Sequence, residues 1–338
     1  MTCACPKFRL NSFKWAYPRC EEILVLTIAR LISQLEKTVR CSSDFLHICR
    51  VGSKLCNERT AFPMKKILKA IYAAIPFKRQ IYSGIRALWT PPESIYKHLH
   101  FKGVFSVPIN GSRSFKVNHF GLKIENEIFW NGLAGKWEKE SLKLWIKLCE
   151  DARVVLDVGA NTGIYALVAQ TLKPEAKVFA FEPHPVFFNM LKQNVATNKF
   201  DIGAFEMAVS DLDGEVVIED YSGQTSQMNV KSTTLDSFVS QQNLTTVDLV
   251  KVDVELHELQ VLRGFSECLR KYRPTLIIEV LTAELAHSIQ GEIGDLGYLY
   301  FNIDEKGGIR QTASIEKSDF YNYLVCTPEI AQKLGLHS

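Results

Sequence analysis

The sequence predicts an α/β fold in which helices cover both faces of a doubly wound parallel sheet. From Arg153 onward, short runs of β-branched residues alternate with helical segments, which is typical of a parallel sheet with crossover helices. The first run is followed directly by a glycine-bearing turn and an apolar helix, and the second ends in a carboxylate. Turns of this kind bind ligands at the carboxyl edge of open parallel sheets.

Composition agrees with a folded chain of one or two domains. The 338 residues are 46% apolar, enough for a buried core, and the net charge of +3 argues against a strongly basic nucleic-acid binder. We therefore expect no nucleic acid as a partner. Residues 1–63 carry 10 basic and 5 acidic side chains, residues 64–100 carry 7 and 1, and residues 101–338 carry 23 and 31. This segregation indicates parts with different roles.

Residues 1–63 hold six of the nine cysteines and no motif that points to a function. The odd cysteine total and the lack of a secretory signal indicate a reducing compartment, so we expect no disulfide framework. Cys3 and Cys5 lack a second pair at ligand spacing, and we predict no metal there. Met64 opens a basic, apolar segment of the kind at which bacterial chains begin. We therefore expect residues 1–63 to be a poorly ordered or spurious extension.

Residues 64–100 are expected to form a basic helical segment. Apolar residues recur at near-helical spacing up to about Trp89, Pro76 divides them into two helices, and the Thr90-Pro91-Pro92 run ends the stretch. Their basic side chains would be either solvated or in peripheral contact with the inner face of a membrane. No early apolar run approaches the length that spans a bilayer, so we predict a cytoplasmic protein.

Residues 101–150 are expected to form a hairpin and helix extension. Apolar and polar residues alternate between Gly103 and Ile124, and Asn110-Gly111 is a turn dipeptide, which together predict a hairpin. Trp130, Trp137 and Trp145 would share one side of the chain if that stretch is helical. We expect these rings to pack against the following domain.

Residues 151–330 contain the runs expected to build the sheet. Seven strands fit a single doubly wound domain. The predicted strands are Val154 to Val158, Lys177 to Glu182, Ala204 to Val209, Val247 to Val252, Thr275 to Val280, Tyr298 to Ile303 and Tyr321 to Cys326.

The turn after the first strand favours a ligand that contains an adenosine. Gly159 and Gly163 let the backbone approach a ligand, and Asp157 could orient the loop or accept hydrogen bonds from an ammonium group. A dinucleotide fingerprint would need Gly-x-Gly-x-x-Gly, but position 161 is Asn. At the end of the second strand, Glu182 could accept hydrogen bonds from both hydroxyls of a ribose.

A longer ordered set of motifs resembles the FkbM-type family of class I S-adenosylmethionine-dependent methyltransferases. The resemblance covers roughly residues 100 to 328. It implies the Rossmann-like, seven-stranded, doubly wound sheet of that class, here with an N-terminal helical and β-hairpin extension. The matching elements are residues 157–163 (DVGANTG), 181–185 (FEPHP) with Asn194, 208–211 (AVSD) with Gly214, 234–238 (TLDSF), 251–258 (KVDVELHE) with Leu262 and Gly264, and 274–279.

The resemblance implies transfer of a methyl group from S-adenosyl-L-methionine to a hydroxyl oxygen. The acceptor would be a small molecule or a glycan sugar. The residues that the family pattern would place around the cofactor are Asp157, Gly159, Asn161, Gly163, Glu182, Ala208 and Ser210.

The motif of residues 251–258 carries the candidate catalytic groups. A general base would assist a hydroxyl acceptor; Asp253 is the leading candidate and His257 the rival. Lys251 could pair with Asp253 or with Glu279 on the next strand, and Glu255, Glu258 and Glu279 are tentative substrate ligands. Acids at this edge could alternatively hold a divalent cation, although we predict none.

The chain departs from the family pattern at Leu256, where the motif Asp-Val-Glu-Gly-x-Glu has glycine. Glycine at such a turn indicates a positive φ or close approach to a ligand, and a leucine side chain penalises both. Leu256 therefore favours one alternative, a non-catalytic methyltransferase fold that binds a partner. A second alternative, an NAD-dependent oxidoreductase, requires the glycine pattern that is missing. The sequence indicates no oligomeric state.

Overall fold

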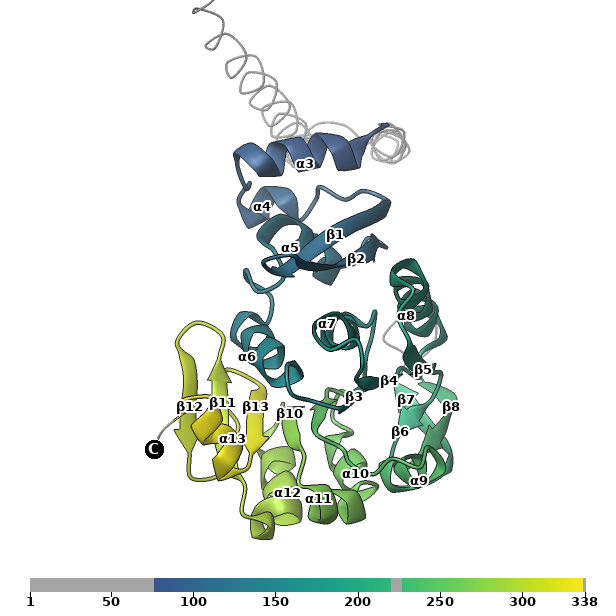
Figure 1. The fold of residues 1–338 in the computed structure, drawn as a ribbon, viewed down its shortest axis with the longest axis vertical. Coiled ribbons are helices and arrows are strands. Elements are labelled where there is room, and N and C mark those ends of the chain that lie inside the picture. The colour runs from purple at the N-terminus through teal and green to yellow at the C-terminus, as the bar shows by residue number, and fades with distance from the viewer. Residues whose placement is uncertain (1–75, 220–226, 337–338) are drawn as a thin grey trace, which may run out of the picture. The chain divides into compact units, whose positions relative to one another are not determined.

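The computed structural model describes residues 76–219 and 227–336 (Figure 1). The chain divides into two compact units, residues 1–89 and 90–338. The described part of the first unit forms helix α3 (Lys78–Leu88), which follows Pro76 as expected. The predictions for residues 1–63 and for the first basic helix lie outside the described residues. Within the described ranges, no helix has the length and hydropathy needed to cross a membrane.

The second unit begins with a short helix and the predicted hairpin. Helix α4 (Glu93–Tyr96) precedes strands β1 (Gly103–Asn110) and β2 (Arg113–His119), which pair antiparallel across the turn at Gly111. Helices α5 (Lys123–Asn131) and α6 (Lys139–Cys149) follow. The three tryptophans do not share one helix, because the chain leaves α5 at Gly132 with a φ of 83°.

The predicted seven-stranded sheet is present and carries one additional edge strand. The order is β12-β11-β13-β10-β9-β3-β4-β5, with the five strands from β10 to β5 parallel and β13, β11 and β12 antiparallel to their neighbours. The extra strand is β12 (Gly308–Thr312). The others are β3 (Val154–Val158), β4 (Lys177–Phe181), β5 (Ile202–Phe205), β9 (Leu249–Val252), β10 (Thr275–Glu279), β11 (Leu299–Asp304) and β13 (Asn322–Cys326).

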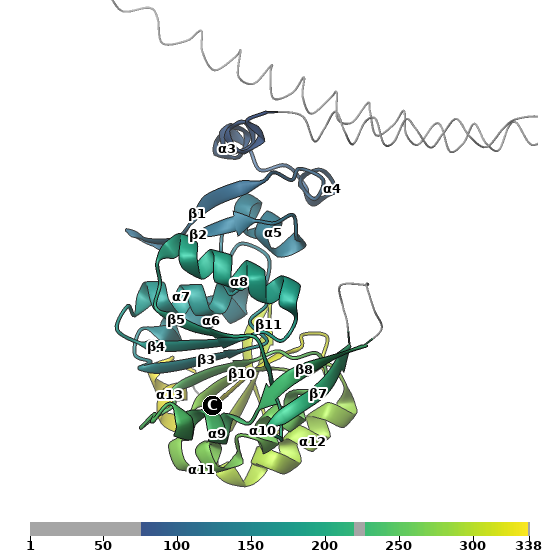
Figure 2. The same ribbon diagram turned by 90° about the vertical axis from the view of Figure 1, so that its right-hand side faces the viewer.

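The predicted third strand, Ala204 to Val209, was wrong as one continuous element. Only β5 belongs to the main sheet, because the chain turns away after Phe205, whose partner is Phe181. Its second half is β6 (Ala208–Val209), which pairs with β8 (Gln227–Thr233) in a second sheet of order β6-β8-β7. Figure 2 shows β8 and β7 (Gly214–Glu219) projecting from the main sheet as a separate ribbon.

Helices cover both faces of the main sheet (Figure 2). On one face lie α6, α7 (Ile164–Leu172) and α8 (Pro185–Asn198). On the other lie α9 (Leu235–Gln241), α10 (Glu258–Arg263), α11 (Ser266–Tyr272) and α12 (Ala283–Ile293). Helix α13 (Pro328–Lys333) follows β13. Because both faces are covered, the central strands read as continuous apolar runs rather than alternating ones.

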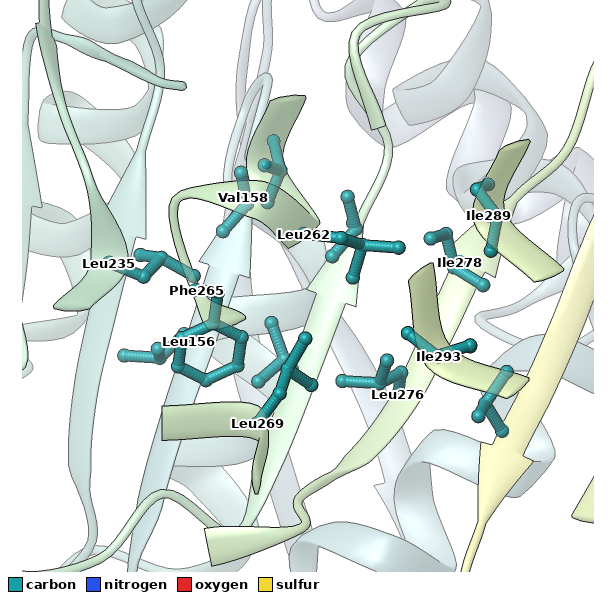
Figure 3. Packing of buried hydrophobic residues seen from close by; sticks show 14 of the residues in the cluster. Leu156, Val158, Leu235, Leu262, Phe265, Leu269, Leu276, Ile278, Ile289 and Ile293 are labelled. Atoms are coloured by element: carbon teal, nitrogen blue, oxygen red, sulfur yellow. The ribbon is translucent and has the colours of Figure 1, made fainter. Parts of the chain in front are cut away.

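A hydrophobic core lies between the sheet and α9 to α12 (Figure 3). Leu156 and Val158 of β3 point toward this side, as do Leu276 and Ile278 of β10. Leu262 of α10 packs among them, together with Phe265 and Leu269 and with Ile289 and Ile293 of α12. This core fixes the strand ends from which the candidate site is built.

Asparagine side chains join the hairpin to α8 and to the turn after β3. The Asn194 side-chain oxygen accepts the Asn118 backbone N–H at 2.9 Å, and its amide donates to the Thr162 carbonyl at 2.8 Å. Nearby, Asn198 accepts the Lys116 N–H at 2.7 Å. The extension and the main domain are thus connected next to the glycine-bearing turn.

Candidate active site

The turn after β3 has residues suited to its backbone. Gly159 and Gly163 have φ values of 80° and 88°, and Asn161 has 51°. The Gly159 N–H donates to the Phe181 carbonyl at 3.0 Å, which holds the turn against the end of β4. A Cβ at Gly159 would lie 1.8 Å from the Asp253 carbonyl oxygen. The turns after β3 and β9 therefore touch through a position that only glycine can occupy.

Asp157 lies buried at the end of β3 and orients the start of α7. Its Oδ2 accepts the Ala166 N–H at 2.9 Å. Burial raises the pKa of Asp157 to about 7, while the ammonium of Lys251 opposes that shift. The Asp157 carboxyl thus fixes the turn through its hydrogen bond to the first turn of α7.

Glu182 lies against the same turn from the end of β4. Its Oε2 accepts the Asn161 N–H at 2.8 Å and its Oε1 accepts the His184 N–H at 2.8 Å. Burial raises the pKa of Glu182 above its usual value, and these two backbone hydrogen bonds oppose the shift. Each carboxylate oxygen keeps a second lone pair, so Glu182 can also accept hydrogen bonds from a ligand.

Ala208 and Ser210 lie at β6, and Ser210 meets the rival base. The Ser210 hydroxyl oxygen and the His257 Nε2 are 2.9 Å apart. Burial lowers the pKa of His257 although Asp211 opposes this, so the imidazole is neutral near pH 7. The structure thus brings His257 toward the residues that the sequence pattern placed around the cofactor.

Lys251 and Asp253 form a buried ion pair at the end of β9. The Lys251 Nζ is 2.8 Å from the Asp253 Oδ2 and 5.0 Å from the centroid of the Tyr165 ring. Lys251 is 2% exposed, whereas the Asp253 side chain is 28% exposed and reaches the surface of the site. Burial alone would lower the pKa of Lys251, but the nearby carboxylates, Asp253 foremost, together more than offset this and raise it.

Of the three tentative substrate acids, Glu279 lies at the end of the neighbouring strand β10. Burial and the charge of Asp253 raise the pKa of Glu279 to about 9. Its buried Oε2 has no hydrogen-bond partner among the described residues. Glu255 is an exposed residue beside Asp253. Partial burial of its carboxyl, and to a smaller extent the charge of Asp253, raise the pKa of Glu255.

Glu258 faces inward. It is fully buried at the start of α10, and its Oε1 accepts the Val254 N–H at 3.0 Å, which closes the turn after β9. Burial raises the pKa of Glu258 to about 7. Between Val254 and Glu258 the backbone is left-handed at two residues that are not glycine: Glu255 has a φ of 54° and Leu256 a φ of 75°. Leu256 therefore adopts the conformation that the family glycine indicated.

Sequence reasoning missed Tyr165 and Glu138, which join this site. The Tyr165 hydroxyl donates to the Glu138 Oε2 at 2.5 Å, and the Tyr165 ring lies against Lys251. Tyr165 follows Gly163 by two residues and could have been found from its place in the first turn of α7. Glu138 carries no such signal, because its left-handed backbone and its distant partner depend on the fold.

The arrangement suits a ligand that carries positive charge and vicinal hydroxyl groups. Carboxyl groups from β3, β4, β9 and β10 meet at one edge of the sheet, and Lys251 neutralises part of their charge. Across the part of the chain that the structure describes, no group of three or more His, Cys, Asp or Glu is arranged to hold a metal ion.

A protein-family model and several known proteins match the part of the chain that contains these residues. Residues 157–300 match the model of the methyltransferase FkbM domain. Hexuronic acid methyltransferase AglP of Haloferax volcanii is 28% identical over 187 residues, covering 53% of this chain and 76% of that protein. The 2-O-methyltransferase NoeI of Sinorhizobium fredii is 29% identical over 147 residues, covering 36% of this chain and 60% of that protein.

Among solved structures, the methyltransferase FkbM from Methylobacillus flagellatus is similar over 52% of this chain and 44% of that one, with 16% sequence identity and a TM-score of 0.35. This chain therefore spans most of the length of the first relative and less than two thirds of the other two.

Proposed function

We propose that this chain, whose residues 157–300 form an FkbM-type methyltransferase domain, transfers a methyl group from S-adenosyl-L-methionine to a hydroxyl oxygen of a sugar or another small molecule. One observation carries the proposal. The matched region begins at Asp157 and contains the glycine turn, Glu182 and the Lys251–Asp253 pair, which the fold brings to one edge of the sheet.

The residues present fit this cofactor. When bound, S-adenosylmethionine would supply a methyl group on a positively charged sulfur. Glu182 offers two carboxylate oxygens to the ribose hydroxyls. The glycines serve the packing of the turn instead, because a Cβ at Gly159 would meet the Asp253 carbonyl and one at Gly163 would meet Leu191. The unpartnered Glu279 Oε2 at the same edge remains available for a hydrogen bond to a ligand.

On the acceptor side we assign the general base to Asp253. Its Oδ2 is held by Lys251, which fixes the carboxylate and leaves Oδ1 to accept the proton of a hydroxyl group. The Asp253 backbone lies against Gly159, so the carboxylate is close to the cofactor turn. His257 is the weaker candidate, because its Nε2 already contacts Ser210. Glu255 and Glu279 would bind acceptor hydroxyls, and Glu258 would support the turn.

We favour a sugar acceptor because the names of two relatives specify a hexuronic acid and a 2-O-methyl transfer. The proposal keeps residues 151–330 as the catalytic domain, residues 101–150 as its hairpin and helix extension, and residues 64–100 as a basic helical segment. It also keeps a cytoplasmic location with peripheral contact at the inner membrane face.

The test uses the full chain. Calorimetry should detect binding of S-adenosylhomocysteine and no binding of NAD. With S-adenosylmethionine and a panel of uronic acids and neutral sugars, mass spectrometry should find a product heavier by one CH₂ group. Asp253→Asn should lower turnover about 100- to 10,000-fold, and His257→Gln much less. Retained turnover in Asp253→Asn would remove the base assignment, and NAD binding would overturn the cofactor.

A second candidate, a non-catalytic binding protein on the same fold, is favoured by Leu256. Its left-handed backbone at the position of the family glycine adds strain beside the proposed acceptor site. Binding of S-adenosylhomocysteine without turnover on any acceptor would favour this candidate.

A further inference from the structure

We propose that Glu138 is a positioning residue of the active site, which acts through Tyr165 on Lys251 and thereby on Asp253. This inference rests on the proposed function and extends the site to a residue that precedes the matched region of 157–300. Three observations support it: the contacts that lead from Glu138 to Asp253, the capping of α6 by Glu305, and the charges around Glu138.

The first support is a continuous series of contacts. The Glu138 Oε2 accepts the Tyr165 hydroxyl at 2.5 Å, and burial raises the pKa of Tyr165 well above its usual value, so this hydroxyl stays a donor. The Tyr165 ring lies 5.0 Å from the Lys251 Nζ, which donates to Asp253 at 2.8 Å. A buried ammonium over an aromatic face is held by the ring as well as by its carboxylate.

Tyr165 is itself held firmly. The Trp145 Nε1 donates to the Tyr165 carbonyl at 3.0 Å, and the two rings meet edge to face with centroids 5.1 Å apart. Trp137, in the segment before α6, lies edge to face with the Tyr165 ring, with ring centroids 6.2 Å apart. The tryptophans thus place the Tyr165 ring, and the hydrogen bond to Glu138 fixes the hydroxyl end of that ring.

The second support is that Glu138 does not cap its own helix. It occupies the N-cap position of α6, yet its side chain makes no capping hydrogen bond and its φ is 40°. Glu305, from the turn between β11 and β12, supplies acceptors instead: its carboxylate accepts the N–H groups of Glu140 at 2.6 Å and of Ser141 at 3.3 Å. This leaves the Glu138 carboxylate for Tyr165.

The third support is the local charge balance. Glu138 faces Tyr165 from α7, Lys251 and Asp253 from β9, and Glu305 from the β11–β12 turn. Burial raises the pKa of Glu138 to about 7, Lys251 opposes this, and the other two carboxylates add to it. A neutral side chain could accept the tyrosine hydroxyl without that repulsion, but it would lose the attraction between Glu138 and the Lys251 ammonium, which helps to raise the pKa of Lys251. Strained, like-charged groups of this kind concentrate at functional sites.

The test compares Glu138→Gln, Tyr165→Phe and the double variant with the wild-type full chain. Each single change should lower kcat about 10- to 100-fold, as expected for a displaced catalytic group, while KM for the acceptor and binding of S-adenosylhomocysteine change little. The double variant should match the worse single variant, because both changes break one unit. Glu140→Gln, in the same turn of α6, and Tyr272→Phe are matched controls that should keep wild-type kcat.

A second readout does not depend on turnover. In ¹⁵N-lysine NMR spectra, the Lys251 ammonium signal, identified by its loss in Lys251→Arg, should move in both single variants and in neither control. Multiplicative kcat losses, or a Lys251 signal that neither variant moves, would overturn the positioning role. Signal changes in the two variants, together with a wild-type chain that shows no turnover on any acceptor, would support the positioning role and contradict methyl transfer.

Discussion

Two turns at the same sheet edge solve a similar backbone problem with different residues. The turns after β3 and β9 follow neighbouring parallel strands, and both contain left-handed residues. After β3 these positions are filled by glycine or asparagine, which tolerate the conformation. After β9 they are Glu255 and Leu256, which do not. The proposed cofactor side is therefore relaxed, whereas the proposed acceptor side stores strain.

The acidic side chains of the two sides also differ, in how completely their oxygens are hydrogen-bonded. Both oxygens of Glu182 accept backbone hydrogen bonds, so the cofactor side is formed before a ligand arrives. Glu258 and Glu279 each keep a buried oxygen without a hydrogen-bond partner in the described ranges. Unsatisfied buried acceptors are costly, and a ligand with hydroxyl groups would satisfy an accessible one.

The contact between the two turns should be the most sensitive point. Gly159→Ala places a Cβ 1.8 Å from the Asp253 carbonyl oxygen in a left-handed backbone, so we expect a loss of about 4 kcal/mol or more in unfolding free energy. Urea denaturation measures it. Gly111→Ala is the control: its φ is also positive but the space around it is open, so about 1 kcal/mol is expected. Equal losses would show that the turns do not depend on this contact.

Glu182→Gln tests the preformed side. The amide group can accept only one of the two backbone N–H groups and carries no charge, so binding of S-adenosylhomocysteine should weaken by about 1.5 to 3 kcal/mol, roughly 10- to 100-fold. Calorimetry measures the affinity. Glu175→Gln, an exposed acid just before β4, should leave it unchanged. An unaltered affinity in Glu182→Gln would contradict the ribose role.

The strained side should depend on pH through Glu258. Burial raises the pKa of Glu258 to about 7 from a usual 4.5, so the folded state holds its proton more tightly than the unfolded state. Its contribution to stability is present below about pH 4.5 and is lost as the pH rises through about 7, by at most about 1.4 kcal/mol per pH unit. Glu258→Gln keeps the acceptor for Val254 and should flatten this part of the pH dependence, measured by urea denaturation. Parallel curves for the two proteins would contradict it.

Leu256→Gly should give the smallest effect and the opposite sign. Glycine removes the left-handed strain but adds entropy to the unfolded chain, and the leucine side chain is already 54% exposed. We therefore expect the free energy of unfolding to rise by about 0.5 to 1 kcal/mol, measured by thermal or urea denaturation. A loss of stability would mean that the leucine side chain stabilises the turn. Faster turnover in this variant would identify Leu256 as a restriction on the acceptor.

Much of the fold could be predicted because it depends on local patterns. Strands such as β3 and β10 are buried on both faces and read directly as apolar runs. The division of the predicted third strand into β5 and β6 could not be read, because the single charged residue after Phe205, Glu206, does not by itself mark a change of sheet. Hydrophobicity reports burial and not which sheet a strand joins.

The candidate site divides in the same way. The Lys251–Asp253 pair was within reach of the sequence, since residues two apart on a strand lie on one face. The left-handed φ of Leu256 followed from the glycine expected there. Glu138 was not predictable, since its partner Tyr165 is distant in sequence and its N-cap position would ordinarily suggest capping.

The position of β13 in the main sheet determines when the sheet can be completed during synthesis of the chain. This strand, which ends at Cys326, lies between β10 and β11 and pairs with both. While the ribosome is still making it, β11 and β12 have each other but no neighbour on the sheet, and one edge of β10 is open. Nascent chains expose such edges to aggregation, so this domain completes its sheet only once its last strand has emerged.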